Sequence, residues 1–461
     1  MSRRIHSMGA LGAVSAILAG LVWAPQAAAV TPPSIINVPP PPGSVGPEQP
    51  MRANFTCRAP GVLEGTNFSD PQAASRLLNL DAVRPLANGA GIKIALLDTG
   101  VTPNFRLPNV KPGGDYINEA DDGMVDCDGH GTLVAGIINA APNPDDSLVG
   151  VAPAAEVFSI RQSSGLFSLE NPPPNSDPDA SRTAVDLRAM ARAVVHAVDL
   201  GAQVINISMT ACMKALRPVD DAGLGAAIHW AVSERNVVVV VAAGNTGTEQ
   251  NNHCVQNPPA RQDDPGSWND LVTVATPAWW SQDVLTVGSV NDQGAPSTFT
   301  LLGPWVGVAA PGERIASLGN YPDGRLVNAE PGTDGQWVPF YGSSFSTAYV
   351  TGLVALVRQK FPQLNAYQVM DRIKATAHAG PGSPDPAVGA GLIDPLAALT
   401  WNVPEQPAPK PPASQVITPA APPPPPDNRP NQVAAWMLGG FAVTALAVIA
   451  VVAALRGKPQ S

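Results

Sequence analysis

Five short runs of apolar residues mark the central part of the chain, at 92–97, 157–160, 204–207, 237–242 and 284–290. Each run is almost continuously apolar, which is typical of parallel strands covered on both faces. Amphipathic stretches with helical spacing separate or follow them, at 186–200, 224–235 and 367–376, and Gly201 is a helix C-cap signal after the first. This alternation predicts an α/β fold with a doubly wound, mostly parallel sheet and helices on both faces.

Proline dominates the sequence on both sides of this central part, over 30–56 and 401–432. Such segments bury too little apolar surface to build a core. We expect the N-terminal extension, 30–56, to run extended over a surface. The linker, 401–432, is expected to be a stiff spacer in the polyproline II conformation. Residues 57–400 then remain as one domain with a single large core.

An apolar segment follows the linker. Residues 433–455 carry no charge, and a helix of that length crosses the roughly 30 Å hydrocarbon layer of a membrane. The sequence therefore predicts a single C-terminal transmembrane helix. Arg456 and Lys458 flank its C-terminal end, and the positive-inside rule places the tail, 456–461, in the cytoplasm. The large domain is then expected on the extracytoplasmic side of the cell membrane, as a single-pass protein.

The first 29 residues have the features of an export signal. Arg3 and Arg4 precede an apolar run at 8–23, and three small residues, 27–29, follow it. These features predict a signal peptide, 1–29, that is cleaved after Ala29. An uncleaved signal anchor is the alternative, because the apolar run is long.

The charge and the cysteine content indicate which partners and which cellular compartment are expected for the protein. Charged residues make up 14% of the chain and the net charge is −10, so the basic surface that nucleic acid requires is not expected. Four cysteines without CxxC spacing predict two disulfides in an oxidising compartment, with three pairings possible, among Cys57, Cys127, Cys212 and Cys254.

Reactive side chains follow several predicted strands. In doubly wound folds, active-site groups gather beyond the carboxyl ends of the strands. Asp98 ends the 92–97 run and precedes Thr99-Gly100, which places a carboxylate at the sheet edge, although on its own the position also fits a turn or helix-cap aspartate. Asn245 follows the 237–242 run. Its amide is suited to binding an oxyanion, or to a left-handed turn.

A histidine and a serine complete the candidate set. His130 lies between two glycines, and the small residues after it are suited to close helix packing. Asp126, Cys127 and Asp128 raise the alternative of a metal site, but a cysteine engaged in a disulfide leaves too few ligands. Ser344 opens an apolar helix, where it is either an N-cap or a nucleophile whose helix N-terminus stabilises an oxyanion.

Together these motifs resemble the subtilisin family over about 91–399. The matching segments stand in the family's order, at 96–100, 128–136, 150–153, 205–208, 243–245, 310–312 and 342–346. The resemblance implies peptide-bond hydrolysis through an acyl-enzyme, with protein or peptide substrates and no metal or organic cofactor. It implies a catalytic triad of Asp98, His130 and Ser344, with Asn245 in the oxyanion hole. An esterase with the same triad would order it Ser, Asp, His along the chain.

The same resemblance indicates where a substrate binds. An extended substrate is expected against Ser208, Met209 and Thr210, with the P1 side chain between that strand and Ala243-Gly244. Thr210 stands where relatives commonly have glycine, so a narrow P1 pocket is expected. Two departures from the family pattern are Ser343, in place of the usual threonine before the nucleophile, and a long polar loop at 247–269.

The order of segments along the chain is similar to that of a narrower family, the mycosins, which are membrane-anchored proteases of mycobacterial type VII secretion systems. Further matching segments are 126–132, 303–306 and 397–401. This resemblance implies a type VII secretion membrane complex as partner and an extension that wraps the domain without blocking the site. It also implies the pairing of Cys57 with Cys127 and of Cys212 with Cys254. A scaffold of the secretion complex, with proteolysis secondary, is the alternative function.

Overall fold

The computed structural model describes residues 30–404, except 35–37, 55, 173–176, 217, 248–253, 260–266, 333 and 381–383. The expected signal peptide, nearly all of the linker, the apolar segment 433–455 and the tail lie outside the described residues. Within the described residues, no helix has the length and apolar character needed to cross a membrane.

The centre of the fold is a seven-stranded sheet, in the order β11-β10-β8-β6-β2-β4-β3, in which every neighbouring pair is parallel. The predicted parallel α/β sheet is thus confirmed. Its strands are β2 (Lys93–Asp98), β3 (Val110–Asp115), β4 (Glu156–Arg161), β6 (Val204–Ile207), β8 (Val238–Ala242), β10 (Val284–Val290) and β11 (Val306–Pro311). Every residue of β6, β8 and β10 is buried, which explains why these strands are almost continuously apolar in the sequence.

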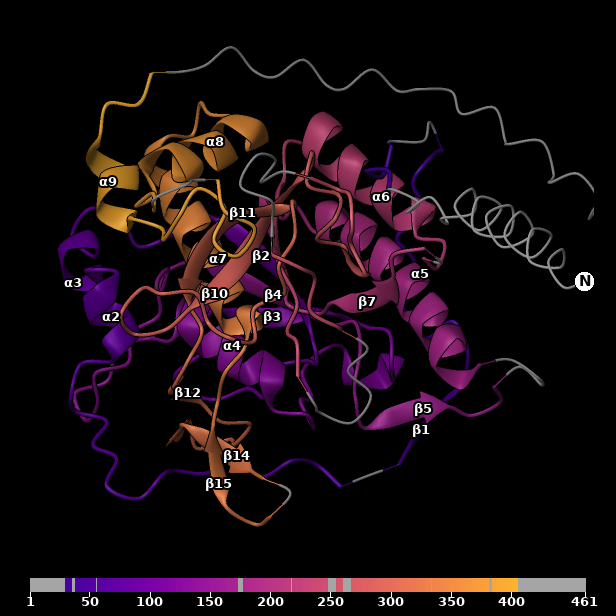
Figure 1. Ribbon diagram of the computed structural model, residues 1–461. Coiled ribbons are helices and arrows are strands. Elements are labelled where there is room, and N and C mark those ends of the chain that lie inside the picture. Colours follow the sequence, from indigo (N-terminus) through magenta and orange to yellow (C-terminus); the bar gives the residue numbers. More distant parts are fainter. Residues whose placement is uncertain are drawn as a thin grey trace, which may run out of the picture. The chain divides into compact units, whose positions relative to one another are not determined.

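Helices cover both faces of this sheet (Figure 1). On one face α4 (His130–Asn139) packs against α7 (Ser343–Lys360), and on the other α5 (Pro178–Asp199) packs against α6 (Ala222–His229). A π-helical turn, Trp230–Glu234, extends α6. The remaining helices are α2 (Ala73–Leu77), α3 (Leu80–Val83), α8 (Ala366–Thr376), α9 (Pro395–Thr400) and a 3₁₀ turn, Glu119–Asp121.

Among the described residues, four two-stranded sheets lie outside the central one. They pair β1 (Met51–Ala53) with β5 (Phe167–Leu169), β7 (Ala211–Lys214) with β9 (Thr273–Thr276), β12 (Ser317–Leu318) with β13 (Leu326–Val327), and β14 (Ala329–Pro331) with β15 (Trp337–Pro339). All four are antiparallel. The β14–β15 hairpin lies at the bottom of Figure 1.

Part of the N-terminal extension lies against α5. Arg188 on this helix forms an ion pair with Glu48 (2.7 Å), and Arg192 donates hydrogen bonds to the carbonyl oxygens of Ser44 and Gly46, both at 3.0 Å. Apart from β1, the described residues of 30–56 form no helix or strand. The backbone of the extension is therefore anchored by side chains of α5 and by β1.

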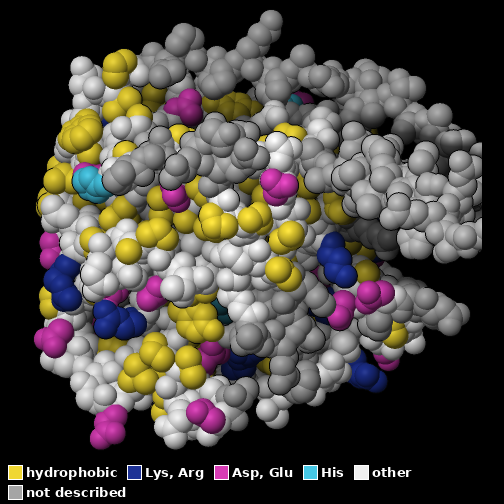
Figure 2. All heavy atoms as spheres, in the orientation of Figure 1, with side chains coloured by type: hydrophobic (Ala, Val, Ile, Leu, Met, Phe, Trp, Pro, Cys, Tyr) yellow, Lys and Arg dark blue, Asp and Glu magenta, His cyan; other side chains and the backbone are white. Residues whose placement is uncertain are grey.

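Charged side chains on the visible face are interspersed by sign. Figure 2 shows acidic and basic side chains spread among uncharged ones over the described part of that face. Such a surface offers no continuous basic stripe to a phosphate backbone there.

Candidate active site

The candidate residues come from the carboxyl ends of neighbouring strands and from two helix N-termini. Asp98 is the last residue of β2, Ser208 directly follows β6, and Asn245 lies shortly after β8. Adjacent parallel strands end at one edge of the sheet, which brings these three side chains together. His130 begins α4, and Ser344 is the second residue of α7.

Asp98 and His130 form a hydrogen-bonded pair. His130 Nδ1 lies 2.7 Å from Asp98 Oδ1, and the Thr99 amide donates to the same oxygen at 2.8 Å. Asp98 is fully buried, whereas the His130 side chain is 28% exposed. The carboxylate therefore fixes one ring nitrogen, while the imidazole reaches the cleft.

The glycines beside His130 permit this approach. Gly129 has a positive φ of 81°, which favours glycine. A Cβ on Gly131 would overlap the carbonyl oxygen of Gly100, in the turn after Asp98. These two positions explain, in steric terms, the glycines that flank the histidine in the sequence.

Charges around His130 change its affinity for protons. Burial lowers the pKa of His130, but the Asp98 carboxylate with its hydrogen bond, together with Asp126 and Asp128, raises this pKa by more. The net pKa lies above the ordinary value of 6.5. The surroundings thus stabilise the imidazolium that forms when His130 takes up a proton.

Ser344 lies in the first turn of α7, where backbone N–H groups have no partner within the helix. It is 8% exposed and, with His130 and Asn245, lines a cleft of about 440 Å³. Asn245 Oδ1 accepts a hydrogen bond from the Ser343 amide at 2.9 Å. Because the oxygen is engaged there, the amide nitrogen of Asn245 is the group that can donate to an oxyanion.

The substrate-binding residues expected from the sequence lie mostly in this cleft. Ser208, Met209, Thr210 and Gly244 line it, whereas Ala243 is fully buried and is not among the lining residues. Thr210 Oγ1 donates to the Ala242 carbonyl oxygen at 3.2 Å. The threonine side chain therefore spans the gap between the two strands that flank the expected P1 position.

The cleft also contains residues that sequence reasoning missed. Arg58, which follows the extension by two residues, forms a 3.0 Å ion pair with Glu330 of β14, and both line the cleft. Phe340 and Tyr341 line it as well, and the Phe345 ring lies 5.3 Å from the His130 ring. Only Phe345 had a local signal, because it directly follows Ser344; Arg58 and Glu330 meet across 272 positions of sequence.

The four cysteines form two disulfides, so the prediction of disulfide bonds is confirmed. They join Cys57 to Cys127 and Cys212 to Cys254, which is the pairing that the mycosin resemblance implies. The first ties the residue directly after the N-terminal extension to the loop before His130. The second joins β7 to the loop after Asn245.

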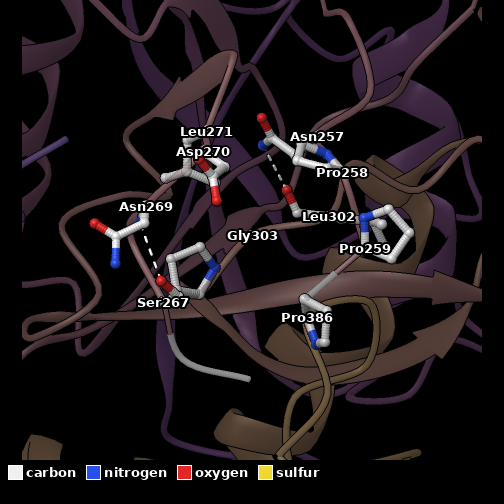
Figure 3. A pocket seen from close by; sticks show the side chains of 11 residues that line it. Asn257, Pro258, Pro259, Ser267, Asn269, Asp270, Leu271, Leu302, Gly303 and Pro386 are labelled. Carbon is white, nitrogen blue, oxygen red and sulfur yellow. Dashed lines mark hydrogen bonds between the residues drawn. The ribbon is translucent and has the colours of Figure 1, made fainter. Parts of the chain in front are cut away.

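A separate pocket of about 380 Å³ is lined by residues of 257–259, 267–271 and 302–304 and by Pro386 (Figure 3). Asn257 organises it by donating to the Leu302 carbonyl oxygen at 2.7 Å and accepting from the Val272 amide at 2.9 Å. Four prolines contribute to its lining, which contains no histidine or cysteine. Within the described residues, no three His, Cys, Asp or Glu side chains are grouped so that they could hold a metal ion.

This fold and cleft are those of a subtilisin-type serine endopeptidase. The model of the subtilase family matches residues 89–391, and the chain belongs to that family. Within it, the chain is similar to the mycosins over nearly its whole length.

Mycosin-1 of Mycolicibacterium smegmatis is 46% identical over 422 residues, which cover 90% of this chain and 92% of the relative. Mycosin-3 of Mycobacterium tuberculosis is 44% identical and covers 92% of each chain. The crystal structure of MycP1 from Mycobacterium smegmatis superposes with a TM-score of 0.78 at 47% identity, covering 82% of this chain and 97% of that one. A chain of the intact ESX-5 inner membrane complex also has a TM-score of 0.78, at 41% identity, covering 92% of this chain and all of its own.

Proposed function

We propose that Asp98, His130 and Ser344 are the catalytic triad of this endopeptidase. The observation that carries the proposal is the 2.7 Å contact between Asp98 and His130 at the cleft that Ser344 also lines. Ser344 Oγ attacks the carbonyl carbon of the scissile bond while His130 Nε2 takes its proton. Asp98 orients the imidazole through Nδ1 and stabilises its charged form.

The reaction then proceeds through a covalent acyl-enzyme. His130 returns its proton to the leaving amine, and water later releases the acyl group by the same chemistry. Asn245 and the Ser344 amide donate hydrogen bonds to the oxyanion. The extended substrate lies along Ser208, Met209 and Thr210, with P1 beside Ala243-Gly244. No metal or organic cofactor enters these steps.

The triad is tested by replacing its nucleophile in the full-length chain purified in detergent. Ser344→Ala is expected to abolish cleavage of a fluorogenic peptide library and labelling by a fluorophosphonate probe, with the circular dichroism spectrum unchanged. Asn245→Ala is expected to lower kcat about 10²–10³-fold, as removal of the corresponding oxyanion-hole donor does in a subtilisin. Undiminished cleavage by Ser344→Ala would transfer the role to Ser343 or Ser346.

We further propose that the chain acts at a type VII secretion membrane complex. The support is that relatives of more than 40% identity include a chain of the intact ESX-5 inner membrane complex and a chain of its periplasmic assembly. In this proposal residues 1–29 are a signal peptide, 30–56 the extension, 57–400 the peptidase domain, 401–432 the linker, 433–455 the transmembrane helix and 456–461 the cytoplasmic tail. The peptidase domain then lies on the periplasmic side of the cell membrane.

Proteolysis and scaffolding are separated by comparing secreted proteins from three strains: wild type, Ser344→Ala and a complete deletion. If cleavage is the main role, both mutants accumulate uncleaved exported proteins. If secretion fails only in the deletion strain, the chain supports the complex structurally, and cleavage is secondary.

A further inference from the structure

Asp126 is a buried carboxylate that the reaction scheme above does not use. It is 3% exposed and lies in the loop before α4. Its Oδ1 accepts hydrogen bonds from Thr99 Oγ1 and the Gly129 amide, both at 2.8 Å. Its Oδ2 accepts from the amide of Thr132 at 2.8 Å and from the hydroxyl of Thr132 at 2.6 Å. One side chain thus binds four donors.

These donors connect Asp126 to both members of the Asp98–His130 pair. Thr99 Oγ1 accepts in turn from the Gly131 amide at 2.9 Å, directly after His130. The Thr99 amide donates to the Asp98 oxygen that His130 contacts. Asp126 therefore joins the end of β2 to the first turn of α4 on both sides of the histidine.

The charge of Asp126 also acts on the site. Burial raises the pKa of Asp126 to about 6, while hydrogen bonds from Thr132 and Thr99 lower it and the charge of Asp98 raises it. The titratable groups that face His130 are Asp98 of β2 and, in the loop before α4, Asp126 and Asp128; all three raise the pKa of His130. Each oxygen of Asp126 faces a backbone N–H, so the ionised form is the one that fits.

We propose that Asp126 is a positioning residue for hydrolysis, whose ionised carboxylate holds Asp98 and His130 in register by joining β2 to α4. The proposal rests on the proposed triad. It assigns to Asp126 no contact with substrate: its effect passes through Thr99, Gly129 and Thr132.

The test uses Asp126→Asn in the full-length chain, with a fluorogenic peptide and a fluorophosphonate probe. In Asp126→Asn an amide N–H replaces one oxygen and faces a backbone N–H of Gly129 or Thr132. Misplacement of reacting groups by about 1 Å can cost about 10²-fold in rate. We expect a loss of that order in kcat and in the labelling rate, with KM little changed. Because one negative charge near His130 is gone, the acidic limb of the kcat/KM profile moves to lower pH.

A matched control is Asp221→Asn, which removes another buried carboxylate with several donors. Asp221 Oδ2 accepts hydrogen bonds from Thr276, Trp279 and Trp280, and Asp221 does not line the cleft. The Asp221→Asn variant is expected to have a lower unfolding midpoint but the wild-type kcat and the wild-type acidic limb. If folded Asp126→Asn behaves in the same way, Asp126 is merely structural and the proposal is wrong.

A second variant decides the matter if Asp126→Asn does not fold. Thr99→Val keeps the carboxylate but removes the hydroxyl between Asp126 and Gly131; kcat and labelling should fall, and Thr99→Ser should restore them. Wild-type rates in folded Thr99→Val overturn the proposal.

Ser344→Ala in the same assays separates the proposed triad from the proposed role of Asp126. If Ser344→Ala stays active, the triad assignment is wrong. If Ser344→Ala is inactive while Asp126→Asn is fully active, only the role of Asp126 is wrong.

Discussion

The residues around His130 predict how the enzyme responds to acid. His130 must be neutral to accept the serine proton, and its pKa lies above the ordinary value. Activity is therefore expected to fall as the pH falls through that raised pKa. Asp128→Asn removes one of the charges that raise the pKa of His130, so the acidic limb should shift to lower pH.

This shift is measured from kcat/KM against pH, with Asp323→Asn as control, because Asp323 is paired with Arg325 on the surface and does not line the cleft. The control should keep the wild-type limb. If the acidic limb of Asp128→Asn lies at the same pH as that of the wild type, the charge of Asp128 does not raise the pKa of His130.

The position of Thr210 predicts which substrate side chains are preferred at P1. Its methyl group lies 3.4 Å from the position a Cβ on Gly244 would take, and its hydroxyl bonds across to the Ala242 carbonyl. A bulky P1 side chain must displace Thr210, and overpacking of that kind costs about 1–3 kcal/mol. Small P1 residues should be cleaved faster than aromatic ones, and Thr210→Gly should remove the difference in a peptide-library profile. Equal rates for Ala and Phe in the wild type would contradict the narrow pocket.

The candidate site residues that the sequence could single out are those with a local pattern. Asp98, His130, Ser344 and Asn245 stand next to glycines or strand ends that mark them, and the fold places their segments at one cleft. Arg58 and Glu330 had no such mark, because their contact depends on how distant segments pack. For Asp126 the sequence indicated only a possible metal ligand, since its four hydrogen bonds are a property of the folded loop.

Among the connections between elements, the disulfide between Cys212 in β7 and Cys254 is expected to contribute measurably to the free energy of unfolding. It spans 42 positions, and cross-links of this kind stabilise a fold by about 2–5 kcal/mol. Replacing both cysteines by serine should lower the free energy of unfolding in urea by that order. Since Cys254 lines the cleft, KM should rise more than kcat falls. An unchanged unfolding free energy would show that packing alone holds this loop.

Elements were predicted well where burial is uniform. The 204–207 and 284–290 runs coincide with β6 and β10, because a strand buried on both faces consists mostly of apolar residues. The edge strands β3 and β11 were missed, since proline and glycine interrupt their patterns. Helix α5 begins at Pro178 rather than at 186 because Asp177 caps its first turn, which carries too few apolar residues to show helical spacing.

At the scale of the whole chain, the proposed layout makes the length of the linker the limit on the distance between the peptidase domain and a membrane. In the polyproline II conformation each residue advances about 3.1 Å, so 401–432 reaches up to about 100 Å. The disulfide at Cys57, the Glu48–Arg188 ion pair and strand β1 hold the extension against the domain. The extension and the linker thus have different tasks: the first is bound to the domain, and the second is expected to act as a spacer.

The final prediction concerns the anchor, 433–455. It contains 23 uncharged residues, about 35 Å of helix, which matches the roughly 30 Å hydrocarbon layer. A chain ending after residue 432 should be exported, recovered in the soluble periplasmic or culture fraction, and as active on the peptide as the full chain. Replacing 433–455 by an unrelated transmembrane helix should restore membrane sedimentation, because anchoring depends on length and hydropathy rather than on specific side chains. If the shortened chain still sediments with membranes after a high-salt wash, the domain itself is bound there, and the apolar segment is not what holds it.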